Sequence, residues 1–100
     1  MDFKSELENI INENKKCDSI CIYVQTKFSH IGSVLVHYDC CIKHNRLMIK
    51  EDGMTRSEVN IDYISKIEYK NNINILSESN EYNLYLEDNS IFTISFINKI

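Results

Sequence analysis

The stretch YNLYLEDNSIFTISFI, residues 82–97, decides the fold because it has the pattern of one complete β-hairpin. Apolar residues recur at every second position on both sides of the polar segment 87–90, and Phe92, Ile94 and Phe96 share one face of the second strand. This alternation is typical of strands that bury one face. Two such strands joined by a short polar turn pair antiparallel.

The same alternation recurs toward the N-terminus. Residues 20–24 alternate, with Ile20, Ile22 and Val24 on one face and Cys21 and Tyr23 on the other. Shorter apolar segments follow within residues 47–76. Residues 34–42 are apolar on both faces. That pattern is typical of a central strand, or of a curved strand whose two halves serve different layers.

Turn signals separate these strands. Asp52–Gly53 is a strong hairpin signal, and Gly32 lies in a segment, 28–33, that we predict to bend. Asn71–Asn72 predicts a further tight turn because asparagine tolerates positive φ. Successive tight turns favour an up-and-down antiparallel sheet, which tends to curl and so remove its exposed edges.

Residues 1–17 predict a helix. Its apolar face repeats at helical spacing through Phe3, Leu7, Ile10 and Ile11. Either Ser5, which has the capping-box spacing to Glu8, or Asp2 can cap its start. We therefore predict one α+β, mostly β domain over residues 1–100: a helix, 1–17, then a strongly curved antiparallel sheet or small barrel of about six to seven strands, 19–97.

Composition restricts the compartment and the source. The 100 residues carry a net charge of −4, no proline and two glycines, and are rich in Ile, Asn and Lys, whose codons are AT-rich. This usage favours an AT-rich bacterium or one of its phages. Glutamates within residues 1–17 interrupt any signal-peptide apolar region, so we expect a cytoplasmic protein without disulfides.

The negative charge gathers in the C-terminal third. Residues 71–98 contain four carboxylates and no Lys or Arg. Such a surface attracts basic partners and repels phosphate backbones, and tyrosines suit protein interfaces. Both features indicate a partner-binding set made of Glu78, Glu81, Tyr82, Tyr85, Glu87 and Asp88.

Metal, cofactor and catalytic signatures are weak. The candidate zinc ligands are Cys17, Cys21, Cys40, Cys41 and His44. Residues four apart on a strand lie about 13 Å apart, and adjacent strand residues face opposite ways, so this spacing does not favour one tetrahedral site. No nucleophile–base arrangement or phosphate-binding loop is evident. We therefore predict a non-enzyme without cofactor or metal.

The order of elements resembles two families of small β-barrels. The segment VNIDYISKI, residues 59–67, is similar to one in bacterial pleckstrin-homology-like domains, and a helix before a bent sheet resembles the Sm-like fold. Gly32 precedes Asp39 by seven residues where the Sm-like pattern has six, and Lys43 replaces its asparagine. The resemblance implies an oligomeric barrel that acts as a scaffold or weak RNA binder.

Size, acidity and inferred source are similar to those of anti-CRISPR and other anti-defence inhibitors. This resemblance implies a protein that docks on a nuclease or other nucleic-acid-handling protein, where carboxylates occupy sites meant for phosphates. Our first functional prediction is therefore an acidic, non-catalytic inhibitor that binds protein and not nucleic acid. The oligomeric barrel is the alternative.

Overall fold

The computed structural model describes residues 2–99. They form a helix, α1 (Phe3–Glu13), eight strands and a 3-10 turn, η1 (Ile61–Tyr63). The strands are β1 (Ser19–Gln25), β2 (His30–Leu35), β3 (Tyr38–Lys43), β4 (Arg46–Glu51), β5 (Met54–Asn60), β6 (Ile64–Ile73), β7 (Ser77–Leu86) and β8 (Ile91–Lys99). A mostly β chain with an N-terminal helix is confirmed, whereas the predicted number of six to seven strands is too low.

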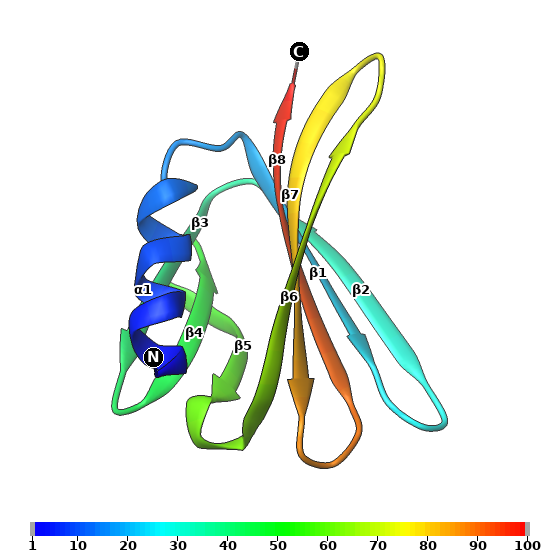
Figure 1. Ribbon diagram of the computed structural model, residues 1–100. Coiled ribbons are helices and arrows are strands. Elements are labelled where there is room, and N and C mark those ends of the chain that lie inside the picture. The colour runs from blue at the N-terminus through cyan, green and yellow to red at the C-terminus, as the bar shows by residue number, and fades with distance from the viewer. Residues whose placement is uncertain (1, 100) are drawn as a thin grey trace.

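The strands form two antiparallel sheets and not one curled barrel. The larger sheet has the order β2-β1-β8-β7-β6, and the smaller has the order β3-β4-β5 (Figure 1). β8 returns beside β1, so the centre of the larger sheet joins strands from opposite ends of the chain. α1 lies next to β3, and helix and small sheet together face the larger sheet (Figure 1).

The barrel prediction is wrong because the chain changes sheets twice. Leu35 pairs with Ile20 in the larger sheet, but Tyr38, three residues later, pairs with Glu51 in the smaller one. Residues 34–42 are therefore apolar on both faces because their two halves serve different layers. The second change occurs at η1, between β5 and β6, where the chain returns to the larger sheet.

The hairpin turns agree with the sequence in part. Asp52 and Gly53 adopt positive φ angles of 50° and 82° in the β4–β5 turn, as predicted. Asn71–Asn72 is not a turn, because β6 continues to Ile73. The Asn74 side chain instead closes the reversal by accepting hydrogen bonds from the backbone N–H groups of Leu76 and Ser77. The predicted 28–33 bend is also displaced, since β2 already begins at His30.

Asp2 caps α1 by accepting a 2.8 Å hydrogen bond from the backbone N–H of Ser5. The helix ends at Glu13, with Asn14 as its C-cap, so it is shorter than the predicted 1–17. Met1, where the predicted helix begins, lies outside the described residues, as does Ile100.

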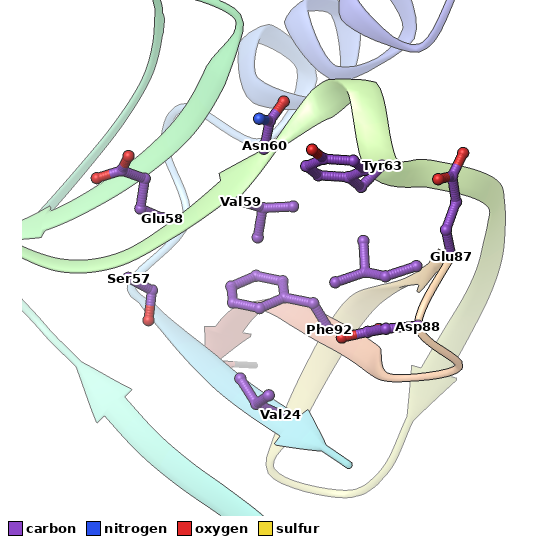
Figure 2. Close-up of a pocket in the computed structure, with 10 residues that line it drawn as sticks. Val24, Ser57, Glu58, Val59, Asn60, Tyr63, Glu87, Asp88 and Phe92 are labelled. Carbon is purple, nitrogen blue, oxygen red and sulfur yellow. The ribbon is translucent and has the colours of Figure 1, made fainter. Parts of the chain in front are cut away.

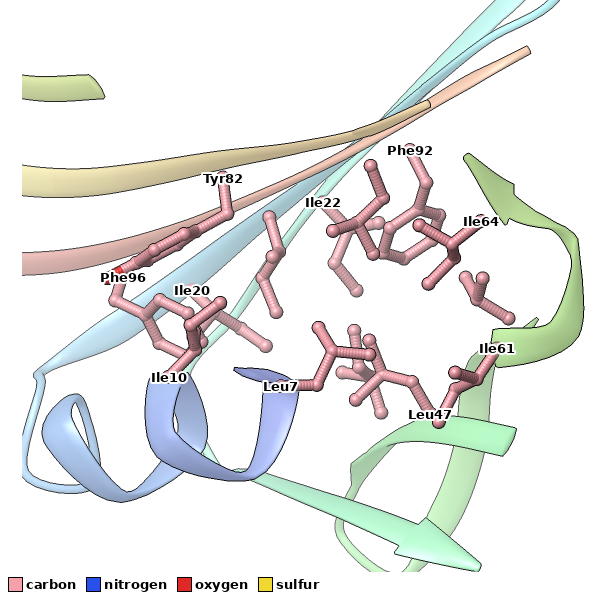
Figure 3. Packing of buried hydrophobic residues seen from close by; sticks show 14 of the residues in the cluster. Leu7, Ile10, Ile20, Ile22, Leu47, Ile61, Ile64, Tyr82, Phe92 and Phe96 are labelled. Atoms are coloured by element: carbon pink, nitrogen blue, oxygen red, sulfur yellow. The ribbon is translucent and has the colours of Figure 1, made fainter. Parts of the chain in front are cut away.

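The core fills the space between the larger sheet and the layer of α1 and β3–β5 (Figure 3). Leu7 and Ile10 of the helix point into it, as Figure 3 shows. Phe92, Ile94 and Phe96 are all buried, which confirms the inward face predicted for the last strand. We call the side of the larger sheet that these residues share its inner face, and the opposite side its outer face.

Candidate binding cavity

A hollow of about 620 Å³ opens at one end of the inner face, beside η1 and the β7–β8 turn (Figure 2). Its volume is in the range of small-ligand sites. We call this region the cavity end. It is lined by Val24, Ser57, Glu58, Val59, Asn60, Tyr63, Leu86, Glu87, Asp88 and Phe92.

The floor of the cavity is apolar because inward positions of four strands meet there. Val24 of β1 pairs with Phe92 of β8, and Val59 of β5 lies across from them (Figure 2). Val59 and Phe92 are buried, whereas Val24 and Leu86 are half-buried. The half-buried carbons offer a ligand an apolar surface whose removal from water is favourable.

Three carboxylates surround this floor, and none of the ten lining residues is Lys or Arg. Glu58 forms an ion pair with Arg46 on β4. Asp88 accepts hydrogen bonds from the hydroxyl and the backbone N–H of Ser90, and these bonds lower its pKa. Neither Glu87 nor Asp88 forms an ion pair among the described residues, and the Glu87 side chain forms no hydrogen bond there either. Glu87 therefore supplies the rim carboxylate that is most available to a ligand.

The rim is held in place by backbone contacts. The backbone N–H of Glu87 donates a 2.9 Å hydrogen bond to the carbonyl oxygen of Tyr63, which ties the β7–β8 turn to η1. The Tyr63 ring is 57% exposed and lies at the cavity near Glu87 (Figure 2). Asp88 also borders a smaller hollow of about 390 Å³, which Lys27 lines as well. Glu87 and Tyr63 are thus the polar and aromatic groups that a ligand in the cavity would meet.

The structure does not bring the six predicted partner-binding residues together. Only Glu87 and Asp88 belong to the cavity. Glu78 lies near the opposite end of β7, about 30 Å away for nine residues of extended chain. Such a distance excludes one shared contact with a small patch of a partner.

The remaining three residues of the set are divided between the faces of β7. Tyr82 is buried on the inner face at 7% exposure. Glu81 and Tyr85 have the opposite parity on the same strand and lie on the outer face. Strand alternation places successive residues of β7 on opposite sides of the sheet, so these neighbouring positions do not form one surface.

Glu58, Tyr63 and the apolar floor are absent from the sequence-based set. They come from β1, β5, η1, β7 and β8, and only the pairing of β1 with β8 brings Val24 next to Phe92. The sequence pattern marks the position of Tyr63, because Asp62–Tyr63 interrupts the strand alternation. No feature of the sequence distinguishes Glu58 from other surface carboxylates.

The other end of the inner face carries hydrogen-bonded polar side chains, and we call it the polar end. The amide of Asn80 donates a 3.0 Å hydrogen bond to the side chain of Asn14, at the end of α1. The same Asn80 accepts bonds from the Tyr69 hydroxyl at 2.8 Å and the Asn71 amide at 3.0 Å. Asn14 is only 5% exposed and also bonds the Ile10 carbonyl. This network connects the helix to β6 and β7.

The cysteines are free thiols, and within residues 2–99 no group of three His, Cys, Asp or Glu residues is placed to hold a metal. Cys17 and the Tyr38 hydroxyl share a hydrogen bond. Burial raises the pKa of Cys17, and burial together with nearby Asp39 raises the pKa of Cys40 to about 12. Both thiols stay protonated at neutral pH, which disfavours nucleophilic attack and metal binding.

Comparison of the chain with protein-family models, curated proteins and solved structures finds no match in any of the three. In residues 2–99, no helix has the length and apolar character needed to cross a membrane. Functional inference therefore depends on the geometry of the cavity end and the surfaces around it.

Proposed function

We propose that this chain is a small acidic, non-catalytic module that binds a basic surface of another protein and seats one of its Lys or Arg side chains in the cavity. The observation that carries the proposal is the Glu87 carboxylate, free of ion pairs among the described residues, at the rim of an apolar floor. Lys and Arg combine a long apolar stem with a terminal positive charge, so they suit a site with an apolar floor and a carboxylate at its rim.

The rim favours a cation in two ways. The carboxylates of Glu87 and Asp88 attract positive charge, and the exposed ring of Tyr63 offers a face for a cation–π contact. The apolar stem would meanwhile cover Val24 and Leu86. An anionic or neutral ligand would gain the apolar contacts but not the electrostatic ones.

Surfaces rich in Lys and Arg are typical of proteins that handle nucleic acids. A rigid sheet that presents carboxylates to such a surface competes with phosphates for it. The biological role that we propose is therefore inhibition of a cytoplasmic nuclease or other nucleic-acid-binding protein, of the anti-CRISPR or anti-defence type. In contrast to the sequence-based set, the contact would centre on Glu87 and Asp88 and not on Glu78 or Glu81.

A titration with single amino-acid probes tests the cavity directly. N-acetyl-arginine amide and N-acetyl-lysine amide would be added to isotope-labelled protein while backbone amide shifts are recorded by NMR. We expect the largest shifts at Tyr63, Leu86, Glu87 and Phe92, and weaker shifts with neutral N-acetyl-norleucine amide. Glu87→Gln should reduce the response, because it removes the charge while retaining the shape.

Glu81→Gln is the matched control, since Glu81 is a carboxylate on the outer face of β7, the strand that leads into the turn of Glu87. It should leave the arginine response unchanged. Equal responses to arginine and norleucine probes, or equal losses in the two variants, would exclude a cation site in the cavity. Once a partner is known, Glu87→Lys should weaken the complex and Glu81→Lys should not, and added duplex DNA should compete.

A further inference from the structure

The larger sheet has an open edge at β2, whose side chains are exposed apart from Leu35 and include no Lys, Arg, Asp or Glu. β2 pairs with β1 on one side and with no strand of the described chain on the other. Residues 28–36, which we call the β2 edge, contain no Lys, Arg, Asp or Glu. Phe28, Ile31, Val34 and Val36 are exposed by 89%, 70%, 65% and 61%. Such an edge is a template for a further strand.

The opposite edge of the same sheet is protected. β6 carries Lys66, Glu68 and Lys70 on successive outer positions, and its pairing with β7 shifts register between Ile64 and Lys66. Edge charges and bulges are the devices by which sheets avoid unwanted pairing. Their presence at β6 and absence from the β2 edge indicate that, of the two edges of the larger sheet, β2 is the one free to pair.

The free backbone groups of β2 can be assigned from its hairpin. The Thr26 N–H donates a 2.8 Å hydrogen bond to the Ser29 carbonyl, so closely bonded pairs recur at every second residue from Ser29. Ser29, Ile31, Ser33 and Leu35 therefore direct their backbone groups toward β1. His30, Gly32 and Val34 direct theirs outward. A strand added at this edge would bond to those three residues.

We propose that the β2 edge pairs with the β2 edge of a second copy, antiparallel and about a two-fold axis at Gly32, to make one continuous ten-stranded sheet. In this register, His30 of one copy lies opposite Val34 of the other. Phe28 and Val36, which precede and follow β2, are strongly exposed apolar side chains near the two ends of this interface.

Two features favour a second copy over an unrelated strand. Two molecules of net charge −4 repel each other except where they approach through an uncharged segment, and the β2 edge provides one. Gly32, at the axis, has no side chain, and the Tyr23 ring covers it while stacking on His30.

Assembly through the β2 edge should end at two copies, because each copy has one such edge. After the two β2 edges meet, the outer strands of the continuous sheet are the two β6 edges, which are charged and bulged. We therefore expect a dimer and no larger assembly.

Sedimentation equilibrium of the full chain over a wide concentration range tests the proposal. The expected mass at high concentration is twice the 11.8 kDa of one chain. Ile31→Lys should weaken association by about tenfold or more, since the two introduced charges lie diagonally across the axis. Ile73→Lys is the matched control because Ile73, on β6, is 68% exposed. It should leave association unchanged.

Val34→Pro provides a second, backbone-level test. It removes an outward N–H and leaves the bonds to β1 intact, so the monomer should stay folded by circular dichroism while the dimer weakens. Hydrogen exchange at His30, Gly32 and Val34 should slow as concentration rises. A monomer at every concentration, growth beyond two copies, or equal effects of Ile31→Lys and Ile73→Lys would each overturn the proposal. Pairing only with a peptide of another protein would overturn it as well.

Discussion

The two ends of the inner face differ in how they treat their polar groups, although both are built from the same strands. At the cavity end, β7 and β8 place Leu86 and Phe92 in the floor of an open hollow with a free carboxylate at its rim. At the polar end, the same β7 places Asn80 in a network that reaches the end of α1. One end has a charge without a partner, while the other satisfies its polar groups internally.

This difference separates binding from stability. A polar group that is fully hydrogen-bonded within the fold has little to offer a ligand, but its removal leaves buried partners unsatisfied. An exposed carboxylate contributes little to folding but retains its charge for a partner. We therefore expect substitutions at the polar end to change stability, and substitutions at the cavity rim to change binding.

Truncation of the core beneath the cavity should have the largest effect. Leu84 has no exposed surface and lies between Phe92 on β8 and Ile67 on β6. Leu84→Ala should lower the free energy of unfolding by about 3 kcal/mol, because it removes buried carbons and leaves a void. Urea unfolding followed by circular dichroism measures this change. A loss below about 1 kcal/mol would mean that the sheet relaxes into the space.

The next largest effect should come from the polar end. Asn80→Ala leaves the side-chain oxygen of the buried Asn14 without its hydrogen-bond donor and should cost about 2 kcal/mol. Asn72→Ala is the matched control, because Asn72 lies on the outer face of β6 without a side-chain hydrogen bond among the described residues. If the two variants lose equal stability, the network does not hold the helix. A double-mutant cycle with Asn14→Ala would then show no coupling.

Much of the fold follows from local patterns, and the errors have a common physical origin. The last hairpin, the Asp52–Gly53 turn and the alternation of β1 are each determined by residues close in sequence. The division into two sheets depends on where the chain leaves one layer for another, and the apolar pattern of residues 34–42 fits both outcomes. Hairpin signals favour neighbouring strands, so they do not reveal that β8 pairs with β1.

The candidate site was less predictable than the fold. Charge counting correctly marks Glu87 and Asp88 as acidic turn residues, but it does not reveal that Glu78 lies at the other end of the sheet. Tyr82 belongs to the core because its parity matches Leu84. The cavity itself is made by long-range pairing, and a single sequence holds no signal for the distance between Val24 and Val59.

A smaller, graded loss of stability should appear at alkaline pH. The Cys40 thiol has a pKa of about 12 in the folded chain, against an ordinary value of 9.0, because burial disfavours its charged form. The stability that the protonated Cys40 thiol contributes is fully present below 9.0, the pKa in the unfolded chain. It is lost as the pH rises toward 12, the pKa in the folded chain. The unfolding free energy should fall by about 1 kcal/mol at pH 10. Cys40→Ala should reduce this loss, and an unchanged pH profile would contradict the assignment.

The smallest effect on stability should come from the residue that matters most for binding. Glu87 is exposed and forms no side-chain hydrogen bond or ion pair among the described residues, so Glu87→Gln should change the unfolding free energy by less than about 0.5 kcal/mol. The turn is preserved, because Glu87 is tied to Tyr63 through its backbone N–H and not through its side chain. Urea unfolding of this variant beside Asn80→Ala measures the contrast directly. A loss as large as that of Asn80→Ala would show that the rim carboxylate supports the fold, and the division between a binding end and a stabilising end would then be wrong.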